Sequence, residues 1–146
     1  GHVIATPGNI TDYNFVEKAI IEDSEKFNIQ TIGYDRTFSG HMSQNLINNQ
    51  IDMAPFKQSF YHMGPAVAET QRLIVGKEIE HGGNPVLDWC ASNAVVRFDA
   101  NGNMLIDKAK SYEKVDGMVA LAMAIGTNQL TDKKESVYED RDIRVL

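Results

Sequence analysis

The chain has 146 residues, 42% of them hydrophobic, and a formal net charge of −6 at pH 7, so it is long enough for one compact domain with a core. An acidic balance of this kind excludes a protein that grips nucleic acid with its whole surface, and any DNA contact must be local. With one cysteine, Cys90, the chain cannot form an internal disulfide. It also lacks an apolar run of roughly 20 residues, which favours a protein without a membrane span.

The first half of the chain is expected to alternate short strands with helices. Apolar spacing predicts a strand at residues 3–5, a helix capped by Asn9 or Thr11 that ends near Phe27, a strand at 29–34, a helix at 40–50 and a strand at 51–56. This order is typical of a largely parallel sheet with helices packed on it, so the predicted fold class is α/β.

The second half predicts helices around one hairpin. Helices are expected at 64–75 and 86–93, and two strands, at 94–99 and 104–107, flank the turn residues Asn101 and Gly102. The closing helix, from about Tyr112 to Gly126, is apolar on nearly every side and must be buried. We assign residues 1–130 to one domain and residues 131–146 to a charged C-terminal tail.

Two carboxylates stand out by their position. Asp35 follows the predicted strand at 29–34, at the edge where open α/β sheets place ligands, and Asp116 lies in the first turn of the closing helix. Each also has an ordinary explanation, Asp35 as a turn residue and Asp116 as an acid that interacts with the helix dipole. If the two converge, they supply ligands for hard divalent cations, which activate water for phosphodiester hydrolysis.

Basic side chains near these acids are candidates for phosphate contacts. Lys108, Lys110 and Lys114 form the densest positive cluster that is not interleaved with acids, although lysines at a strand end and a helix entrance are commonplace. His81, beside a Gly-Gly pair, is a further candidate, but stabilising the turn is the commoner role for a histidine there. The histidine spacing predicts no zinc site, and no Walker-type phosphate loop is present.

Six short segments follow one another in an order and spacing that belong to a known family. They are Thr6-Pro7-Gly8-Asn9 with Asp12-Tyr13, Ile32-Gly33-Tyr34-Asp35, His81-Gly82-Gly83-Asn84-Pro85-Val86-Leu87, Ser92-Asn93, Lys108, and Val115-Asp116-Gly117-Met118-Val119-Ala120-Leu121. Each is a weak signal by itself. Together they make the chain from Val3 to Ile125 resemble the nuclease domain of tailed-phage terminase large subunits.

The resemblance implies a ribonuclease H-like (resolvase-like) sheet with flanking helices and a metal-dependent endonuclease that cuts concatemeric double-stranded viral DNA. It implies that Asp35 and Asp116 are catalytic ligands of a pair of Mg²⁺ or Mn²⁺ ions, and that DNA is contacted by Lys108, Lys110, Lys114 and His81. The implied partners are double-stranded DNA, the portal protein, the terminase small subunit and an upstream ATPase domain, in the cytoplasm of the bacterial host.

The chain departs from the family pattern in two places. Arg36-Thr37 follows Asp35 where the family commonly has a Pro-Trp or similar pair, which alters the surroundings of the carboxylate. Residues 1–5 align with a later strand of the sheet, so we expect the strand that carries the family's first aspartate to lie upstream. The metal site is then incomplete, and the chain alone is expected to be weak or inactive unless a surrogate ligand is supplied by Asp12, Asp52 or Asp107.

Two other functions stay open at this point. A non-catalytic module that docks on the portal or holds DNA is favoured by the acidic charge and the missing strand. A doubly wound small-molecule binder is suggested by the early strand and helix alternation but lacks a glycine-rich phosphate loop. The position of Asp35 relative to Asp116 discriminates between them, because a metal role requires both carboxylates to reach ions that lie about 4 Å apart.

Overall fold

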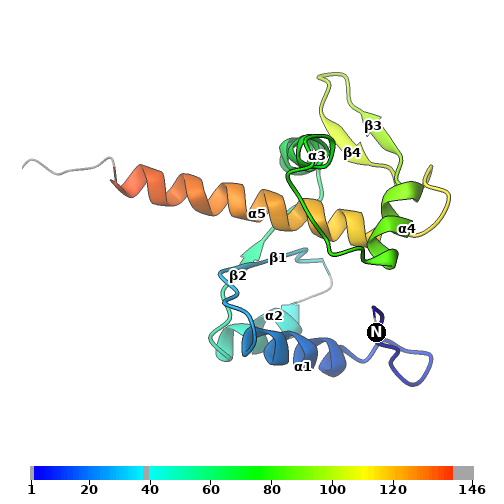
Figure 1. Ribbon diagram of the computed structural model, residues 1–146. Coiled ribbons are helices and arrows are strands. Elements are labelled where there is room, and N and C mark those ends of the chain that lie inside the picture. Colours follow the sequence, from blue (N-terminus) through cyan, green and yellow to red (C-terminus); the bar gives the residue numbers. More distant parts are fainter. Residues whose placement is uncertain (1, 38–39, 140–146) are drawn as a thin grey trace, which may run out of the picture.

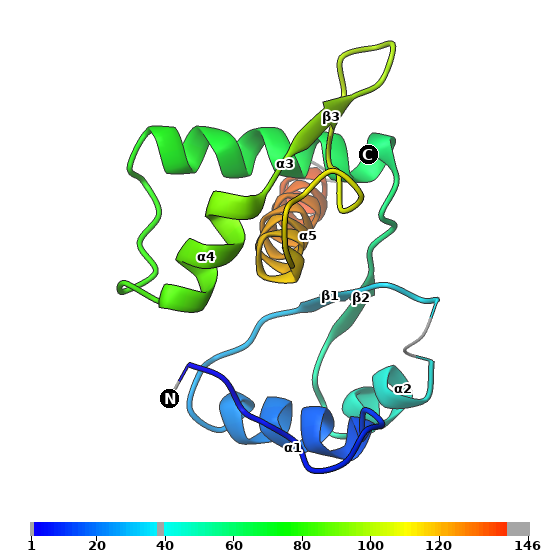
Figure 2. The ribbon, with the colours of Figure 1, turned by 90° about the vertical axis from the view of Figure 1, so that its right-hand side faces the viewer.

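One long helix, α5 (Asp116–Glu139), runs through the middle of the computed structural model, and the other elements lie on two sides of it (Figures 1 and 2). The structure describes residues 2–37 and 40–139, with side chains to residue 131. Two helices and a hairpin cover one side of α5, and a small sheet backed by two helices covers the other. Among the helices of this described part, none combines the length and the apolar character needed to cross a membrane.

The sheet beside α5 consists of two parallel strands, β1 (Ile32–Tyr34) and β2 (Met53–Pro55). The register places Gly33 opposite Ala54, and α2 (Gly40–Asn48) makes the crossover that a parallel pair requires. Because β1 ends at Tyr34, the chain leaves the carboxyl edge of the sheet at Asp35.

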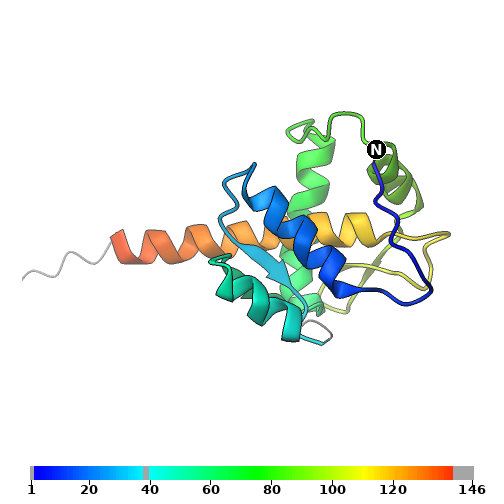
Figure 3. The same cartoon turned by 90° about the horizontal axis from the view of Figure 1, so that it is seen from below.

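Two helices lie beneath this sheet, on the side away from α5 (Figures 2 and 3). The first, α1 (Tyr13–Ser24), begins after Asp12, whose side chain accepts a hydrogen bond from the backbone N–H of Asn14 at 2.9 Å. It contributes no buried residue, whereas α2 buries Leu46 completely. The outer layer is therefore held mainly through α2.

The opposite side of α5 is covered by α3 (Phe60–Val75), α4 (Pro85–Asn93) and an antiparallel hairpin of β3 (Val96–Phe98) and β4 (Met104–Ile106). Figure 2, which looks along α5, shows α3 crossing it and α4 lying beside its first turns. The hairpin turn is closed by Asp99, whose Oδ1 accepts hydrogen bonds from two backbone N–H groups.

The core forms where α5 meets these layers, and it needs glycine at two close approaches. A Cβ at Gly126 would lie 2.6 Å from Phe56 Cζ and 2.8 Å from Ala66 Cβ, and one at Gly33 would collide with Thr127 Oγ1. The first glycine lets α5 approach α3, and the second lets β1 approach α5. The buried cluster comprises Phe56, Met63, Ala66, Val67, Cys90, Ile106, Val115, Met118, Val119, Ala122 and Met123.

Most of the predicted elements are confirmed. The parallel pairing of the two early strands, the hairpin about Asn101-Gly102 and the burial of the closing helix all agree with the sequence. The expected burial is not complete, because Ala120 and Ala124 form an exposed stripe along α5. Small side chains on this stripe leave room for a groove.

Two boundaries differ from the expectation. Residues 3–5 form no strand, and their side chains are exposed. Their backbone pairs with no strand in the part of the chain that the structure describes. The closing helix begins at Asp116 rather than Tyr112 and continues past Gly126 to Glu139, because Gly126 serves helix packing instead of a helix end. The proposed boundary between residues 130 and 131 lies inside α5, and residues 140–146 of the tail lie outside the described residues.

The close packing at Gly126 predicts an unusual effect of alanine. Gly126→Ala should lower the free energy of unfolding by about 1–2 kcal/mol, although alanine is the better helix former, because the added methyl group overpacks the contact with Phe56 and Ala66. Urea unfolding measures the change. Gly40→Ala adds the same methyl group to α2 in open space and should be neutral or slightly stabilising; equal stability of the two variants would contradict the packing argument.

Candidate active site

A groove of about 580 Å³ runs between β1 and the first turns of α5. Its walls include Gly33 and Tyr34 of β1 and the small side chains Ala120 and Ala124 of α5. Asp35, Lys108 and Asp116 also line it. The structure thus brings the two carboxylates predicted from the sequence, which are 81 positions apart in the chain, to one groove together with one of the predicted lysines.

Asp35 is oriented by the residue two positions later. Its Oδ1 accepts hydrogen bonds from the Thr37 hydroxyl at 2.7 Å and from the Thr37 backbone N–H at 3.0 Å. These hydrogen bonds, first from the hydroxyl and then from the backbone, lower the pKa of the Asp35 carboxyl, and the positive charge of Lys108 lowers it further. Thr37 therefore helps to keep this carboxylate ionised.

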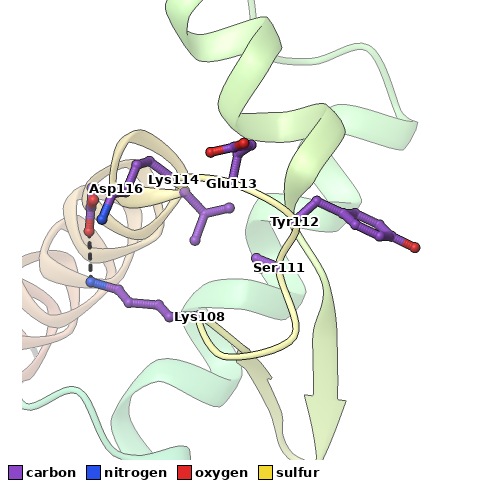
Figure 4. Close-up of a pocket in the computed structure, with 7 residues that line it drawn as sticks. Lys108, Ser111, Tyr112, Glu113, Lys114 and Asp116 are labelled. Carbon is purple, nitrogen blue, oxygen red and sulfur yellow. Dashed lines mark hydrogen bonds and ion pairs between the residues drawn. The ribbon is translucent and has the colours of Figure 1, made fainter.

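Asp116 is the first residue of α5 and is held by a lysine from another part of the chain. The Lys108 ammonium donates a hydrogen bond to Asp116 Oδ1 at 2.8 Å (Figure 4). This bond is the main cause of a lowered pKa of the Asp116 carboxyl, and the charge of Lys114 acts in the same direction. Both acids of the groove are thus anionic at neutral pH.

Lys108 is presented by a turn that directly follows β4. Asp107, almost completely buried, accepts hydrogen bonds at Oδ1 from the backbone N–H groups of Ala109 and Lys110. Its backbone carbonyl also accepts from the N–H and the hydroxyl of Ser111. The backbone of this turn is therefore fixed, while the Lys108 side chain is about half exposed.

A second hollow, of about 490 Å³, shares the Lys108–Asp116 pair with the groove (Figure 4). It is lined by Lys108, Asp116 and the segment between Ser111 and Val115. Lys114 therefore lies close to the site, as its effect on Asp116 also indicates. Lys110 is exposed on the same turn, and its side chain lines neither this hollow nor the groove.

His81 lies apart from these residues, before α4. Its Nδ1 accepts a hydrogen bond from the Asn84 backbone N–H at 3.0 Å, and its Nε2 lies 3.3 Å from Asp88 Oδ1. It lines a different, largely apolar hollow of about 230 Å³ with Leu87 and Met118. This position fits the turn-stabilising role, and a DNA contact by His81 stays a prediction.

Two further polar residues near Lys108 were not singled out as site residues. Arg97, on β3, has its guanidinium 4.9 Å from the Phe60 ring centroid and its Nε 3.9 Å from Asp107 Oδ2. With Gln58 and Lys108 it lines a third hollow of about 270 Å³. The predicted hairpin could have indicated that Arg97 lies near Lys108, because strand pairing sets Arg97 opposite Leu105, three residues before Lys108.

The carboxylates that could have completed a metal site are engaged elsewhere. Asp12 caps α1, Asp52 accepts a hydrogen bond from the Thr31 hydroxyl at 2.8 Å, and Asp107 holds the turn before Lys108. None of the three lines the groove. Within residues 2–37 and 40–131, no group of three or more histidine, cysteine or acidic side chains is placed to hold a metal ion.

Comparisons with known proteins agree with one another. Residues 2–132 match the family described as terminase large subunit, endonuclease domain. The large terminase subunit of Enterobacteria phage HK97 is 38% identical over 128 residues, which cover 86% of this chain and 25% of that protein. Protein YmfN of Escherichia coli K12 is 24% identical over 145 residues, 95% of this chain and 31% of that protein.

A solved structure supports the same family. The crystal structure of the HK97 large terminase matches with a TM-score of 0.77 and 37% identity, covering 84% of this chain and 26% of that chain. The match confirms the predicted α/β fold class, that of terminase nuclease domains. The chain spans between a quarter and a third of the length of these curated relatives.

The Lys108–Asp116 pair predicts how the acid titrates. Asp116 should titrate below the ordinary range of aspartate, and Lys108→Met should raise its pKa, because the ammonium stabilises the charged carboxylate. The pair thus stabilises the folded chain above the ordinary aspartate pKa, and this contribution is lost as pH falls through the lowered value.

Carboxyl ¹³C NMR over acidic pH measures the midpoint. Asp99 is the internal control, because a hydrogen bond from Asn103 lowers its pKa and no lysine is involved. An unchanged Asp116 midpoint in the Lys108→Met variant would contradict the assignment of cause.

Proposed function

The chain belongs to the terminase large subunit endonuclease-domain family, and from this membership we propose that it is the DNA-cutting domain of a phage packaging motor. The observation that supports this most is the meeting of Asp35 and Asp116 on one groove, from a strand end and a helix start that are far apart in sequence. The proposed reaction is hydrolysis of a phosphodiester bond in concatemeric double-stranded viral DNA.

The two acids fit a site for Mg²⁺ or Mn²⁺. Both are anionic oxygen ligands, which hard divalent cations prefer, and Asp116 already holds a cationic group, the Lys108 ammonium. A pair of such ions makes the attacking water more acidic and stabilises the charge on the leaving oxygen. We propose that Asp35 and Asp116 hold the metal and that a further carboxylate from outside these 146 residues completes the site.

The basic residues around the groove support a local DNA contact. Lys108, Lys114 and Arg97 line hollows that adjoin the acids, and Lys110 lies on the turn that carries Lys108. We propose that these side chains bind backbone phosphates and so place the scissile bond beside Asp35 and Asp116. A contact of this size is compatible with a net charge of −6, because it uses one face only.

In the whole large subunit, we propose that this domain works with the ATPase part of the same polypeptide, the portal protein and the terminase small subunit, in the cytoplasm of the host. The curated relatives are three to four times longer than the matched region, so these partners belong to the larger protein. The fold also suits a second candidate, a module that holds DNA or docks without cutting. It is favoured by the acidic charge and by the absence of a three-residue metal group within the described side chains.

Plasmid cleavage decides between the two functions. Supercoiled plasmid is incubated with Mn²⁺ and either this chain or a longer polypeptide of the large subunit that includes residues upstream of Gly1. We expect the longer polypeptide to cut and this chain to cut weakly or not at all. In the longer polypeptide, Asp116→Asn should reduce cutting at least about 100-fold, because a neutral amide replaces a metal ligand.

Asp88→Asn is the matched control, because Asp88 is an exposed acid on α4 that does not line the groove. It should leave cleavage unchanged. If the longer polypeptide with its native Asp116 does not cut, the non-catalytic module becomes the better explanation.

A DNA-binding measurement tests the basic face. Replacing Lys108 and Lys114 by methionine should weaken binding to a short duplex and reduce the slope of log K against log salt by about 0.9 for each phosphate that the protein no longer neutralises. Fluorescence anisotropy at several salt concentrations gives this slope. Replacing Lys18 and Lys77, which lie outside the groove, removes the same charge and should leave the slope unchanged; an equal reduction in both proteins would argue against a local contact.

A further inference from the structure

The ion pair between Lys108 and Asp116 lies at the boundary between two hollows. Both residues line the 490 Å³ hollow and the 580 Å³ groove, and Lys108 also lines the 270 Å³ hollow beside Arg97. In Figure 4 the Lys108 chain extends from its turn to the start of α5, and its ammonium ends at the Asp116 carboxylate. This ammonium therefore holds one oxygen of a carboxylate that would serve as a metal ligand.

An ammonium and a divalent cation compete at that oxygen. They carry charges of the same sign, so each weakens the binding of the other when both lie close to Asp116 Oδ1. If Asp35 and Asp116 hold a metal ion, that ion would also be repelled by Lys108, whose charge already acts on both carboxyls. The repulsion between the two cations therefore favours a site that holds one of them at a time.

The Lys108 side chain can change its position, whereas Asp107 and Arg97 are held by contacts with their neighbours. Its side chain is flexible and 52% exposed, while the Asp107 turn fixes the backbone from which it extends. Arg97 cannot take over its place, because its guanidinium stacks on Phe60 and its Nε faces Asp107. The 270 Å³ hollow lined by Arg97 and Gln58 offers the displaced ammonium a second position, next to another cation that attracts phosphate.

We propose that Lys108 is the resident counter-ion of Asp116, that a divalent cation binds the groove only by displacing it, and that the displaced ammonium then takes a DNA phosphate in the adjoining hollow. This inference rests on the proposed function. It makes Lys108 a positioning residue that lowers metal affinity when DNA is absent. A bound phosphate then favours metal binding, and bound metal favours phosphate binding, by the same factor.

The test is a Mn²⁺ titration of the chain without DNA, followed by paramagnetic broadening of backbone amide signals at residues 33–37 and 116–120. Lys108→Met should bind Mn²⁺ about three- to tenfold more tightly than the native chain, because the competing hydrogen-bonded charge is gone. Lys108→Arg keeps the charge and should bind as the native chain does. Lys18→Met, an equal charge change on α1, should have no effect.

The outcomes separate this inference from the proposed function. If Mn²⁺ broadens the groove signals in every protein with the same midpoint, or if Lys108→Met binds more weakly, Lys108 is no competitor and the inference is overturned, while the metal site stands. Tighter binding by Lys108→Arg would also overturn it. If no protein shows broadening at the groove at millimolar Mn²⁺, removal of Lys108 creates no measurable affinity and the inference is overturned, while plasmid cleavage by the longer polypeptide still decides the metal-dependent function.

Discussion

The arrangement of this domain follows from the need to cover one apolar helix on two of its sides. From Val115 to Ile125 the chain contains almost no polar side chain, so water must be kept from α5 by α3 and α4 on one side and by β1 on the other. Burial fixes the axis of α5, and its N-terminus then lies beside the carboxyl end of β1. Packing therefore brings Asp116 and Asp35 to the walls of one groove.

The parts of this architecture that depend on local pattern were predictable from sequence. Strand and helix alternation indicated the parallel pair, the Asn101-Gly102 turn indicated the hairpin, and strand-end and helix-start positions drew attention to Asp35 and Asp116. Interactions that depend on where segments meet could not be predicted. Thr37 binding Asp35, Lys108 reaching Asp116, and Arg97 stacking on Phe60 each depend on geometry that no spacing rule encodes. The predicted end of the closing helix at Gly126 was wrong for the same reason, because glycine occurs both at helix ends and at close helix contacts.

The electrostatics of the groove are compatible with the anionic substrate that we propose, although the chain as a whole is acidic. Lys108 and Lys114 act on Asp116, and Lys108 also acts on Asp35, so the local field differs from the average over the whole surface. Hydrogen bonds from Thr37 and Lys108 keep both carboxylates ionised without complete burial. A high local density of charge lowers the stability of the fold only slightly in a site of this kind, because most of the charged groups are paired.

The contact of Gly33 with Thr127 has a consequence for how mutational data on this family should be interpreted. It fixes β1 against α5 two residues before Asp35 and eleven residues after Asp116, roughly 16 Å along the helix from the latter. A side chain at Gly33 would press β1 away from α5, and we expect it to shift one acid relative to the other while leaving both intact. If the proposed function holds, a screen for loss of DNA cutting would score Gly33 as strongly as a metal ligand. A catalogue of essential positions would then overstate the size of the reactive centre unless folding and metal affinity were measured separately.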